Sequence, residues 1–214
     1  MMRASDQLLT GWGRTAPSRA RLVDVDDAEL VAHGPAALAD GRGLIARGLG
    51  RSYGDAAQNA GGTVVRLAPG PIHLDPATGT VRVGAGVSLD ELLRHIVPRG
   101  FFVPVTPGTR FVTVGGAIAS DIHGKNHHRD GSFGDHLVDM TMLLADGERR
   151  RITATDGDLW WATIGGMGLT GVILEATVRL IPIETSRCLV DTERLPNLDA
   201  LLERMAASDA AYRY

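Results

Sequence analysis

The sequence predicts an α+β fold, built as one domain or as two small lobes. Three observations predict it. The chain has 214 residues, 44% of them hydrophobic, which is enough to bury a core. Short β-branched runs bounded by turn residues alternate with a few short helical segments. There are 27 glycines, many outside obvious turns, which indicates places where the backbone lies close to other groups.

The first third of the chain is expected to contain an irregular arm, three strands and a partly helical segment. Gly11, Gly13 and Pro17 discourage regular structure in residues 1–18, with Trp12 as an anchor. The segment 26–40 is rich in Ala and Leu, and Gly34-Pro35 should interrupt its helix. The expected strands are 20–25, 44–46 and 63–67.

The middle of the chain predicts a strand pair, a helix and a further strand. The runs 71–75 and 80–86 alternate on either side of a turn at 76–79. Ser88-Leu89-Asp90-Glu91 is a capping box, so a helix is expected over 89–97. The run FFVPV at 101–105 is expected to be a strand. Together these elements predict a small α+β lobe over about residues 19–105.

The second lobe is expected over residues 106–183. Two strands should flank an Asp146-Gly147 turn within 136–153, followed by a short helix at 158–164 and a strand within 171–183. Residues 184–214, with a helical segment near 198–207, are expected to be the start of a further, truncated substrate domain.

Composition excludes several classes of function. A net charge of -3 and a pI of about 6.1 argue against a nucleic-acid partner. No run predicts a transmembrane helix or a signal peptide, which predicts cytosolic synthesis and leaves peripheral membrane contact open. The single cysteine, Cys188, excludes an intrachain disulfide and a cysteine-rich metal site.

A polar cluster follows the run of small residues at 113–120. It comprises Asp121, His123, Lys125, Asn126, His127 and His128, and Lys125 is the only lysine of the chain. We expect no metal, because His127 and His128 are adjacent and no recognised ligand spacing occurs. Two alternatives stay open for the histidines, contact with a cofactor or a satisfied turn. Lys125 could pair with Asp121 or place a cation beside an anionic cofactor.

Two glycine-rich stretches are candidates for anion binding. In the run RGLGRSYGD at 47–55, consecutive backbone N–H groups could form a nest for phosphate, flanked by Arg47 and Arg51. The alternative is a mobile turn. In TVGGAIAS at 113–120, Thr113 should cap a short helix whose first N–H groups would be free for an anion. Tight helix–sheet packing explains that stretch equally well.

A third glycine motif is a decoy. Residues 166–171 read GMGLTG, which matches the dinucleotide-binding fingerprint letter for letter. That fingerprint must follow a strand and open a helix, whereas here a helix precedes it and a strand follows. We therefore reject a Rossmann site.

In this order, RGLGRSYGD, PGT with TVGGAIASDIHGKNHH, and GGMGLTGVI resemble the FAD-binding domain of the vanillyl-alcohol-oxidase-like flavoproteins, a PCMH-type domain of two α+β subdomains. The similarity covers about residues 11–182. The run DIHGKNHH preceded by VGGAIAS is most similar to the flavin subunits that oxidise decaprenylphosphoryl-β-D-ribose in cell-wall arabinan synthesis.

The resemblance implies FAD extended between the subdomains. It implies that 47–55 and 113–116 hold the pyrophosphate, that 120–123 lie along the flavin, and that Val172 and Ile173 meet the adenine. It implies His123 and Lys125 as polar groups near flavin or sugar. The implied cofactor-binding residues are Ala46, Arg47, Gly48, Leu49, Gly50, Arg51, Ser52, Tyr53, Gly54, Asp55, Gly108, Thr113, Val114, Gly115, Gly116, Ser120, Asp121, Ile122, His123, Val172 and Ile173.

The resemblance also implies an activity and partners. The 2-hydroxyl of a lipid-linked ribose would be oxidised to a ketone, and a partner short-chain reductase would complete epimerisation. The family leaves a membrane-associated or periplasmic location open. Tyr53 stands where many relatives carry a flavin-linking histidine, so we expect non-covalent FAD. Ser120 stands where relatives often have cysteine, a small polar replacement.

Two rival functions remain. One is oxidation of another alcohol, of the alditol or lactone type. The other is a truncated fragment that binds FAD, or merely folds, without turnover. The general base of the reaction is expected to lie outside this chain.

Overall fold

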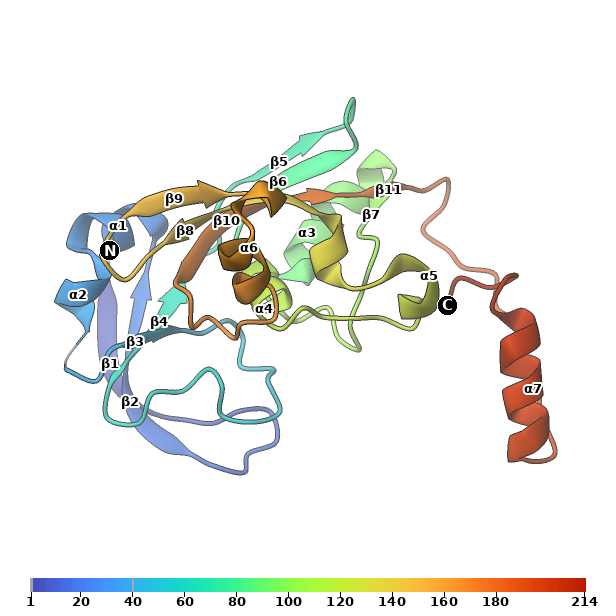
Figure 1. Cartoon of the computed structure of the whole chain (residues 1–214), viewed down its shortest axis with the longest axis horizontal. Coiled ribbons are helices and arrows are strands. Elements are labelled where there is room, and N and C mark those ends of the chain that lie inside the picture. Colours follow the sequence, from blue (N-terminus) through green and yellow to red (C-terminus); the bar gives the residue numbers. More distant parts are fainter. Residues whose placement is uncertain (1, 40) are drawn as a thin grey trace.

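The computed structural model describes residues 2–39 and 41–214 and contains two main β-sheets, with an 11-residue helix standing apart from them (Figure 1). The first sheet has the order β1-β2-β4-β3, with β1 and β2 antiparallel and the other pairs parallel. Its strands are β1 (Arg3–Leu9), β2 (Ser18–Val25), β4 (Thr63–Leu67) and β3 (Leu44–Ala46). Helices α1 (Asp27–His33) and α2 (Pro35–Leu38) lie between β2 and β3 in the chain.

The second sheet is antiparallel throughout and has the order β5-β6-β10-β8-β9. Its strands are β5 (Ile72–Asp75), β6 (Thr80–Gly84), β10 (Val172–Arg179), β8 (Leu137–Leu143) and β9 (Arg149–Ile152). Because β6 pairs with β10, the expected lobe boundary at 105/106 falls inside the unit built around this sheet.

Short helices cover the second sheet. The main core contains buried residues of α3 (Leu89–Ile96), α4 (Val114–Ala119) and α6 (Asp158–Thr163), together with Val81, Met140 and Ala176 of the strands. The remaining elements are η1 (Val97–Arg99), β7 (Phe101–Phe102), α5 (His127–Asp130), η2 (Phe133–His136), η3 (Ala154–Asp156), β11 (Ile181–Pro182) and α7 (Leu198–Ser208).

A smaller core joins the two sheets. Val23 and Val65 of the first sheet pack in one cluster with Val172 and Leu174 of the second sheet and Leu30 of α1. Each of these side chains is at most 4% exposed. Their burial holds the two sheets against each other.

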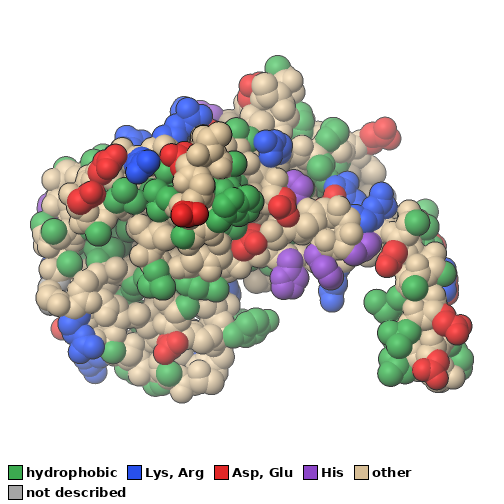
Figure 2. Space-filling model, in the orientation of Figure 1, with side chains coloured by type: hydrophobic (Ala, Val, Ile, Leu, Met, Phe, Trp, Pro, Cys, Tyr) green, Lys and Arg blue, Asp and Glu red, His purple; other side chains and the backbone are tan. Residues whose placement is uncertain are grey.

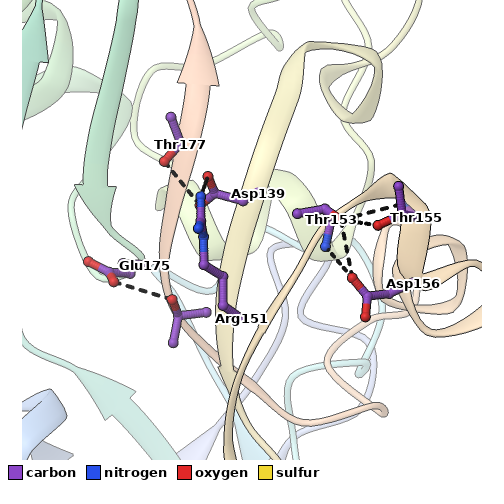
Figure 3. Close-up of polar contacts among 8 residues, drawn as sticks. Asp139, Arg151, Thr153, Thr155, Asp156, Glu175 and Thr177 are labelled. Carbon is purple, nitrogen blue, oxygen red and sulfur yellow. Dashed lines mark hydrogen bonds and ion pairs between the residues drawn. The ribbon is translucent and has the colours of Figure 1, made fainter.

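Polar contacts tie neighbouring strands of the second sheet together (Figure 3). The carboxylate of Asp139 on β8 accepts from Arg151 on β9 at 2.7 Å and from Thr177 on β10 at 3.1 Å. Asp139 is 7% exposed, so these bonds compensate its lost hydration.

Most of the expected elements are confirmed. The strands at 20–25, 44–46 and 63–67, the strand pair around 76–79 and the interrupted helix at 26–40 all occur. The capping box is formed, with Glu91 N–H donating to Ser88 Oγ and Ser88 N–H to the Glu91 carboxylate. The Asp146-Gly147 turn and the helices near 158–164 and 198–207 also occur.

Two expectations about strands are wrong. The N-terminal arm is not irregular throughout, since β1 pairs with β2 along its whole length. Six of its seven side chains are exposed, so its sequence carries no burial pattern. The strand expected over 101–105 ends at Phe102, because Pro104 has no N–H for a ladder bond.

Within the part of the chain that the structure describes, no helix combines the length and apolar character needed to cross a membrane.

Candidate functional site

A cavity of about 730 Å³ is lined by both main sheets and by the glycine-rich loops, a size typical of ligand pockets. The expected site residues that line this cavity are Ala46, Arg47, Gly48, Leu49, Gly50, Arg51, Ser52, Tyr53, Gly54, Gly108, Thr113, Gly115, Gly116, Ser120, Ile122, His123 and Ile173. Residues far apart in the sequence thus meet at one site.

The loop 47–55, called here the cofactor loop, presents unused backbone donors. Apart from Arg47 N–H, which bonds Val65 O at 2.8 Å, none of its N–H groups donates to a protein acceptor among the described residues. Residues 48–55 are half-buried or exposed, so water can accept from these N–H groups, and beside a cavity they are equally available to a ligand. Successive free N–H groups of this kind form anion-binding nests.

Several carbonyls of the cofactor loop are already used. Ser52 O accepts from Trp12 N–H at 2.7 Å, and Tyr53 O accepts from Gly13 N–H at 3.1 Å. Leu49 O accepts from the Arg51 guanidinium at 2.7 Å. The carbonyls of Ser52 and Tyr53 are therefore turned toward residues 12 and 13, while the N–H groups of residues 48–55 have no acceptor among the described residues.

The two arginines of the loop do not act as simple phosphate cations. The Arg47 guanidinium donates to Ala57 O at 3.0 Å and to Thr10 O at 2.7 Å. Partial burial, and secondarily Arg66, lower the pKa of Arg47. The Arg51 guanidinium lies 5.1 Å from the ring centre of Trp12, a cation–π contact.

The second expected anion site is wrong in its mechanism. Thr113 caps α4 as expected, with its hydroxyl accepting from Gly116 N–H at 3.1 Å. The next donors are also taken, because Val114 N–H bonds Val87 O and Gly115 N–H bonds Ala85 O. The start of α4 therefore offers no free donors in its first turn. Gly115 and Gly116 line the cavity as small surfaces instead.

The two glycine-rich stretches lie in direct contact. A Cβ on Gly48 would lie 2.4 Å from Thr113 Oγ1, which is far closer than side chains tolerate. Gly50 has φ of +68°, and a Cβ there would meet the Arg47 guanidinium. Glycine is needed at these positions for close approach and for the left-handed turn.

The rejected dinucleotide motif lies as expected between a helix and a strand. Residues 166–171 run from the end of α6 to the start of β10, and Met167 N–H bonds Ala119 O at 2.8 Å. Met167, Gly168 and Gly171 line the cavity. The motif contributes a wall to the site without being a Rossmann turn.

The polar cluster divides between cavity and surface. His123 is exposed and lines the cavity, whereas Lys125 is exposed and does not line it. Asp121 accepts from Gly134 N–H at 2.9 Å, and no ion pair links it to Lys125 in the described part of the chain. Asn126 is fully buried and donates to Pro104 O and Asp130.

Several histidine side chains gather at the edge of the body that faces α7 (Figure 2). His123 and His127 lie with ring centres 5.9 Å apart. Among the described residues, no group of three His, Cys, Asp or Glu side chains is placed to hold a metal ion.

Five expected residues do not line the cavity, namely Asp55, Val114, Asp121, Lys125 and Val172. Val114 and Val172 are buried in the cores, at 0% and 4% exposed. Sequence reasoning missed a further set of residues that line the cavity. These are Trp12, Ala56, Ala57, Val65, Leu67, Ala85, Gly86, Pro107, Thr109, Val112, Ala119, Met167, Gly168 and Gly171. Most are small or apolar and carry no chemical signal, but the glycines of 166–171 could have been found from their motif.

Comparison with known proteins agrees with this geometry. The profile of a family described as FAD binding domain matches residues 25–153, more than half of the chain. Over 213 residues the chain is 51% identical to decaprenylphosphoryl-beta-D-ribose oxidase of Mycolicibacterium smegmatis. The match covers 96% of this chain and 46% of that protein.

More distant relatives are other oxidoreductases. The chain is 31% identical to D-lactate dehydrogenase of Anaerostipes hadrus over 118 residues, 52% of this chain and 25% of that protein. It is 28% identical to alditol oxidase of a Streptomyces species over 143 residues, 65% and 34% of the two chains. The chain thus spans less than half the length of each of these relatives. The cofactor shared by the matching family is FAD, and the chain belongs to the family of PCMH-type FAD-binding domains.

Proposed function

We propose that this chain is the FAD-binding part of an oxidoreductase that converts the 2-hydroxyl of a lipid-linked ribose, decaprenylphosphoryl-β-D-ribose, to a ketone in cell-wall arabinan synthesis. The observation that carries the cofactor assignment is the cofactor loop, whose free N–H groups lie beside a cavity of about 730 Å³. The relative that is 51% identical over 96% of this chain supports the substrate.

The residues of the cavity fit FAD. The N–H groups of residues 48–54, which line the cavity, would hold the pyrophosphate, because they have no protein acceptor in the described part of the chain. Gly48, Gly115 and Gly116 leave room for the ligand against the backbone. Ile173 lines the cavity and offers an apolar side chain for the adenine end.

The segment Ser120–His123 would lie along the flavin. When bound, FAD supplies the oxidant that takes the hydride from the C2 carbinol. His123 would contribute a polar group at the flavin end, since it lines the cavity and makes no side-chain hydrogen bond among the described residues. Lys125, two residues further on an exposed loop, would serve the substrate side.

The flavin would be held without a covalent bond. Tyr53, at the position of the linking histidine in many relatives, is 81% exposed, and its phenol is no usual flavin attachment. Acid precipitation of the yellow protein should release all flavin into the supernatant. Colour that stayed in the pellet would contradict this.

A second candidate is oxidation of another alcohol, favoured by the similarity to alditol oxidase. A third is a fragment that binds FAD without turnover. Anaerobic flavin bleaching distinguishes them. We expect the purified chain to take up FAD. In a longer protein of the relatives' length, we expect the bound flavin to be bleached by a lipid-linked ribose and not by alditols.

Each other outcome has a definite meaning. Bleaching by alditols would favour the second candidate, and bound FAD without bleaching by either would favour the third. Failure to take up FAD would overturn the proposal.

We further propose that the cofactor domain, which includes β1, runs to about residue 183, and that residues 184–214 belong to a substrate domain. A short-chain reductase would complete epimerisation, and the lipid tail of the substrate would bring the enzyme to a membrane surface. Co-purification of such a reductase with the longer protein would support the first of these partners.

A further inference from the structure

The segment Thr10–Gly13, called here the N-terminal strap, lies against the cofactor loop. We propose that the strap, together with the Arg47 side chain, is the positioning device that holds the loop with its N–H groups toward the cavity. This inference deepens the proposed function and rests on the loop being the pyrophosphate site.

The strap holds the loop through its carbonyls. Trp12 N–H bonds Ser52 O at 2.7 Å, and Gly13 N–H bonds Tyr53 O at 3.1 Å. In a planar trans peptide the C=O of one residue and the N–H of the next point in opposite directions. Fixing the carbonyls of Ser52 and Tyr53 on the strap therefore turns the N–H groups of Tyr53 and Gly54 away from it.

Arg47 links the strap to the far end of the loop. One guanidinium nitrogen donates to Thr10 O in the strap at 2.7 Å, and the other donates to Ala57 O beyond the loop at 3.0 Å. Both acceptors are neutral carbonyls of the protein. The planar fork of arginine bonds these two acceptors from two separate nitrogens, whereas lysine can donate only from a single ammonium nitrogen. Arg47 is thus a brace rather than a phosphate ligand.

The strap sequence leaves no room for larger residues. A Cβ on Gly11 would lie 1.9 Å from Gly54 O, and a Cβ on Gly13 would lie 2.6 Å from Tyr53 O. Arg51 of the loop lies over the Trp12 ring at 5.1 Å and adds a side-chain contact. The two glycines therefore permit backbone contact along residues 52–54.

The strap also lies outside the part of the chain that matches the FAD-binding family, which begins at residue 25. The family match therefore does not itself account for these contacts, because the strap lies within the 24 residues that precede the matched range.

The first experiment compares Gly11→Ala with Gly147→Ala in the full chain. Gly147 lies in the β8–β9 turn with φ of +89°, so its substitution strains the backbone far from the cavity. ADP and adenosine serve as probes, because only ADP carries the pyrophosphate. Loss of one or two hydrogen bonds to a charged group corresponds to about tenfold weaker binding or more.

We expect Gly11→Ala to weaken the binding of ADP by about tenfold or more and the binding of adenosine by less than about twofold. Gly147→Ala should change neither binding affinity, even if it lowers the melting temperature as much as Gly11→Ala does. Equal ADP affinity in Gly11→Ala and the parent chain would overturn the inference, as would equal weakening of ADP and adenosine.

The second experiment compares Arg47→Lys with Arg47→Met. If Arg47 acts by bonding the two carbonyls, both variants should weaken ADP binding to a similar extent. The salt dependence of ADP binding should then stay as in the parent chain. If its charge contacts phosphate directly, Arg47→Lys should retain most of the affinity and Arg47→Met should lose both affinity and salt dependence. That second pattern would overturn the inference.

A combined variant adds a test of mechanism. Gly11→Ala and Arg47→Met act through the same loop, so their effects on ADP affinity should be less than additive. Additive losses would contradict a shared device. If the parent chain bound neither FAD nor ADP, the proposed function would fail and this inference with it. Normal binding in the parent chain with unaffected variants would overturn the inference alone.

Discussion

At the scale of single residues, the site works through backbone donors and through the absence of side chains. Apart from that of Arg47, the N–H groups of the cofactor loop find no acceptor among residues 2–39 and 41–214. Gly48 and Gly50 make this arrangement sterically feasible, one by close approach and the other by a positive φ. Charged side chains play a smaller part, because Arg47 bonds protein carbonyls.

Gly48→Ala should weaken FAD binding. The added Cβ would lie 2.4 Å from Thr113 Oγ1, so the loop must move from the α4 cap that it touches. We expect at least about tenfold weaker FAD binding, measured by quenching of flavin fluorescence. Thr113→Ser is the comparison variant, because serine keeps the oxygen that caps α4. Unchanged affinity in Gly48→Ala would contradict the close contact.

His123→Ala should affect chemistry and not stability. The side chain is exposed and lines the cavity, so its removal should change the free energy of unfolding by less than about 0.5 kcal/mol. In the longer protein it should slow anaerobic flavin reduction by substrate. His128→Ala, an exposed neighbour outside the cavity wall, is the control. Equal rates in the two variants would remove His123 from the flavin end.

At the scale of elements, the same short-helix motif can be predicted correctly and interpreted wrongly. The capping of α4 by Thr113 follows from residue type. That its next N–H groups bond Val87 O and Ala85 O depends on the turn after β6 lying beside it. Sequence-local reasoning contains no information about such a partner.

Elements with strong local signals, including the β-branched strands, were predictable from the sequence, whereas a strand without a burial pattern was not. The box Ser88–Glu91 and the Asp146-Gly147 turn specify their own geometry. Strand β1 has six exposed side chains of seven and exists because β2 offers it a partner. The wall residues Ala85 and Gly86 belong to the cavity only because the fold brings them there.

Ser88→Ala should destabilise the whole fold without touching the cofactor. It removes the capping oxygen of α3, whose Leu89, Leu92 and Ile96 are fully buried, at a cost of about 1 kcal/mol. Asn197→Ala removes the cap of α7, which has no buried residue, so global unfolding should not change. Urea unfolding measures both. A larger loss for the α7 variant would contradict these packing roles.

At the scale of the whole molecule, the two sheets share a core and enclose the cavity between them. Val172 and Leu174 of β10 pack with Val23, Val65 and Leu30 from the first sheet and α1. The start of α1 also places Asp27 near Glu175 of β10. Stability and cofactor binding are therefore properties of the joined sheets.

Asp27 should make stability depend on pH. Burial, then repulsion from Glu175, raises the pKa of Asp27 from its ordinary 3.8 to about 6. The folded state then holds the proton more tightly than the unfolded state, so this contribution to stability falls as pH rises from about 4 to 6. Above that window the full penalty remains.

Asp27→Asn removes this penalty. It should stabilise the chain at pH 7.5 by no more than about 1 kcal/mol, since the group is only half buried and is partly screened by solvent. At pH 4 the gain should vanish. Urea unfolding at the two pH values measures the difference, and a gain that was larger at pH 4 would contradict the sign.

The central claim, that FAD is held by the free N–H groups of the cofactor loop, is tested most directly by amide hydrogen exchange with and without FAD. Before addition, the amides of residues 48–55 should exchange rapidly, because they lack acceptors, whereas those of Val114, Gly115 and Gly116 should be protected. Saturating FAD should slow exchange in the loop by about tenfold or more and leave these three amides nearly unchanged. Saturable FAD binding without protection of residues 48–55 would contradict the account.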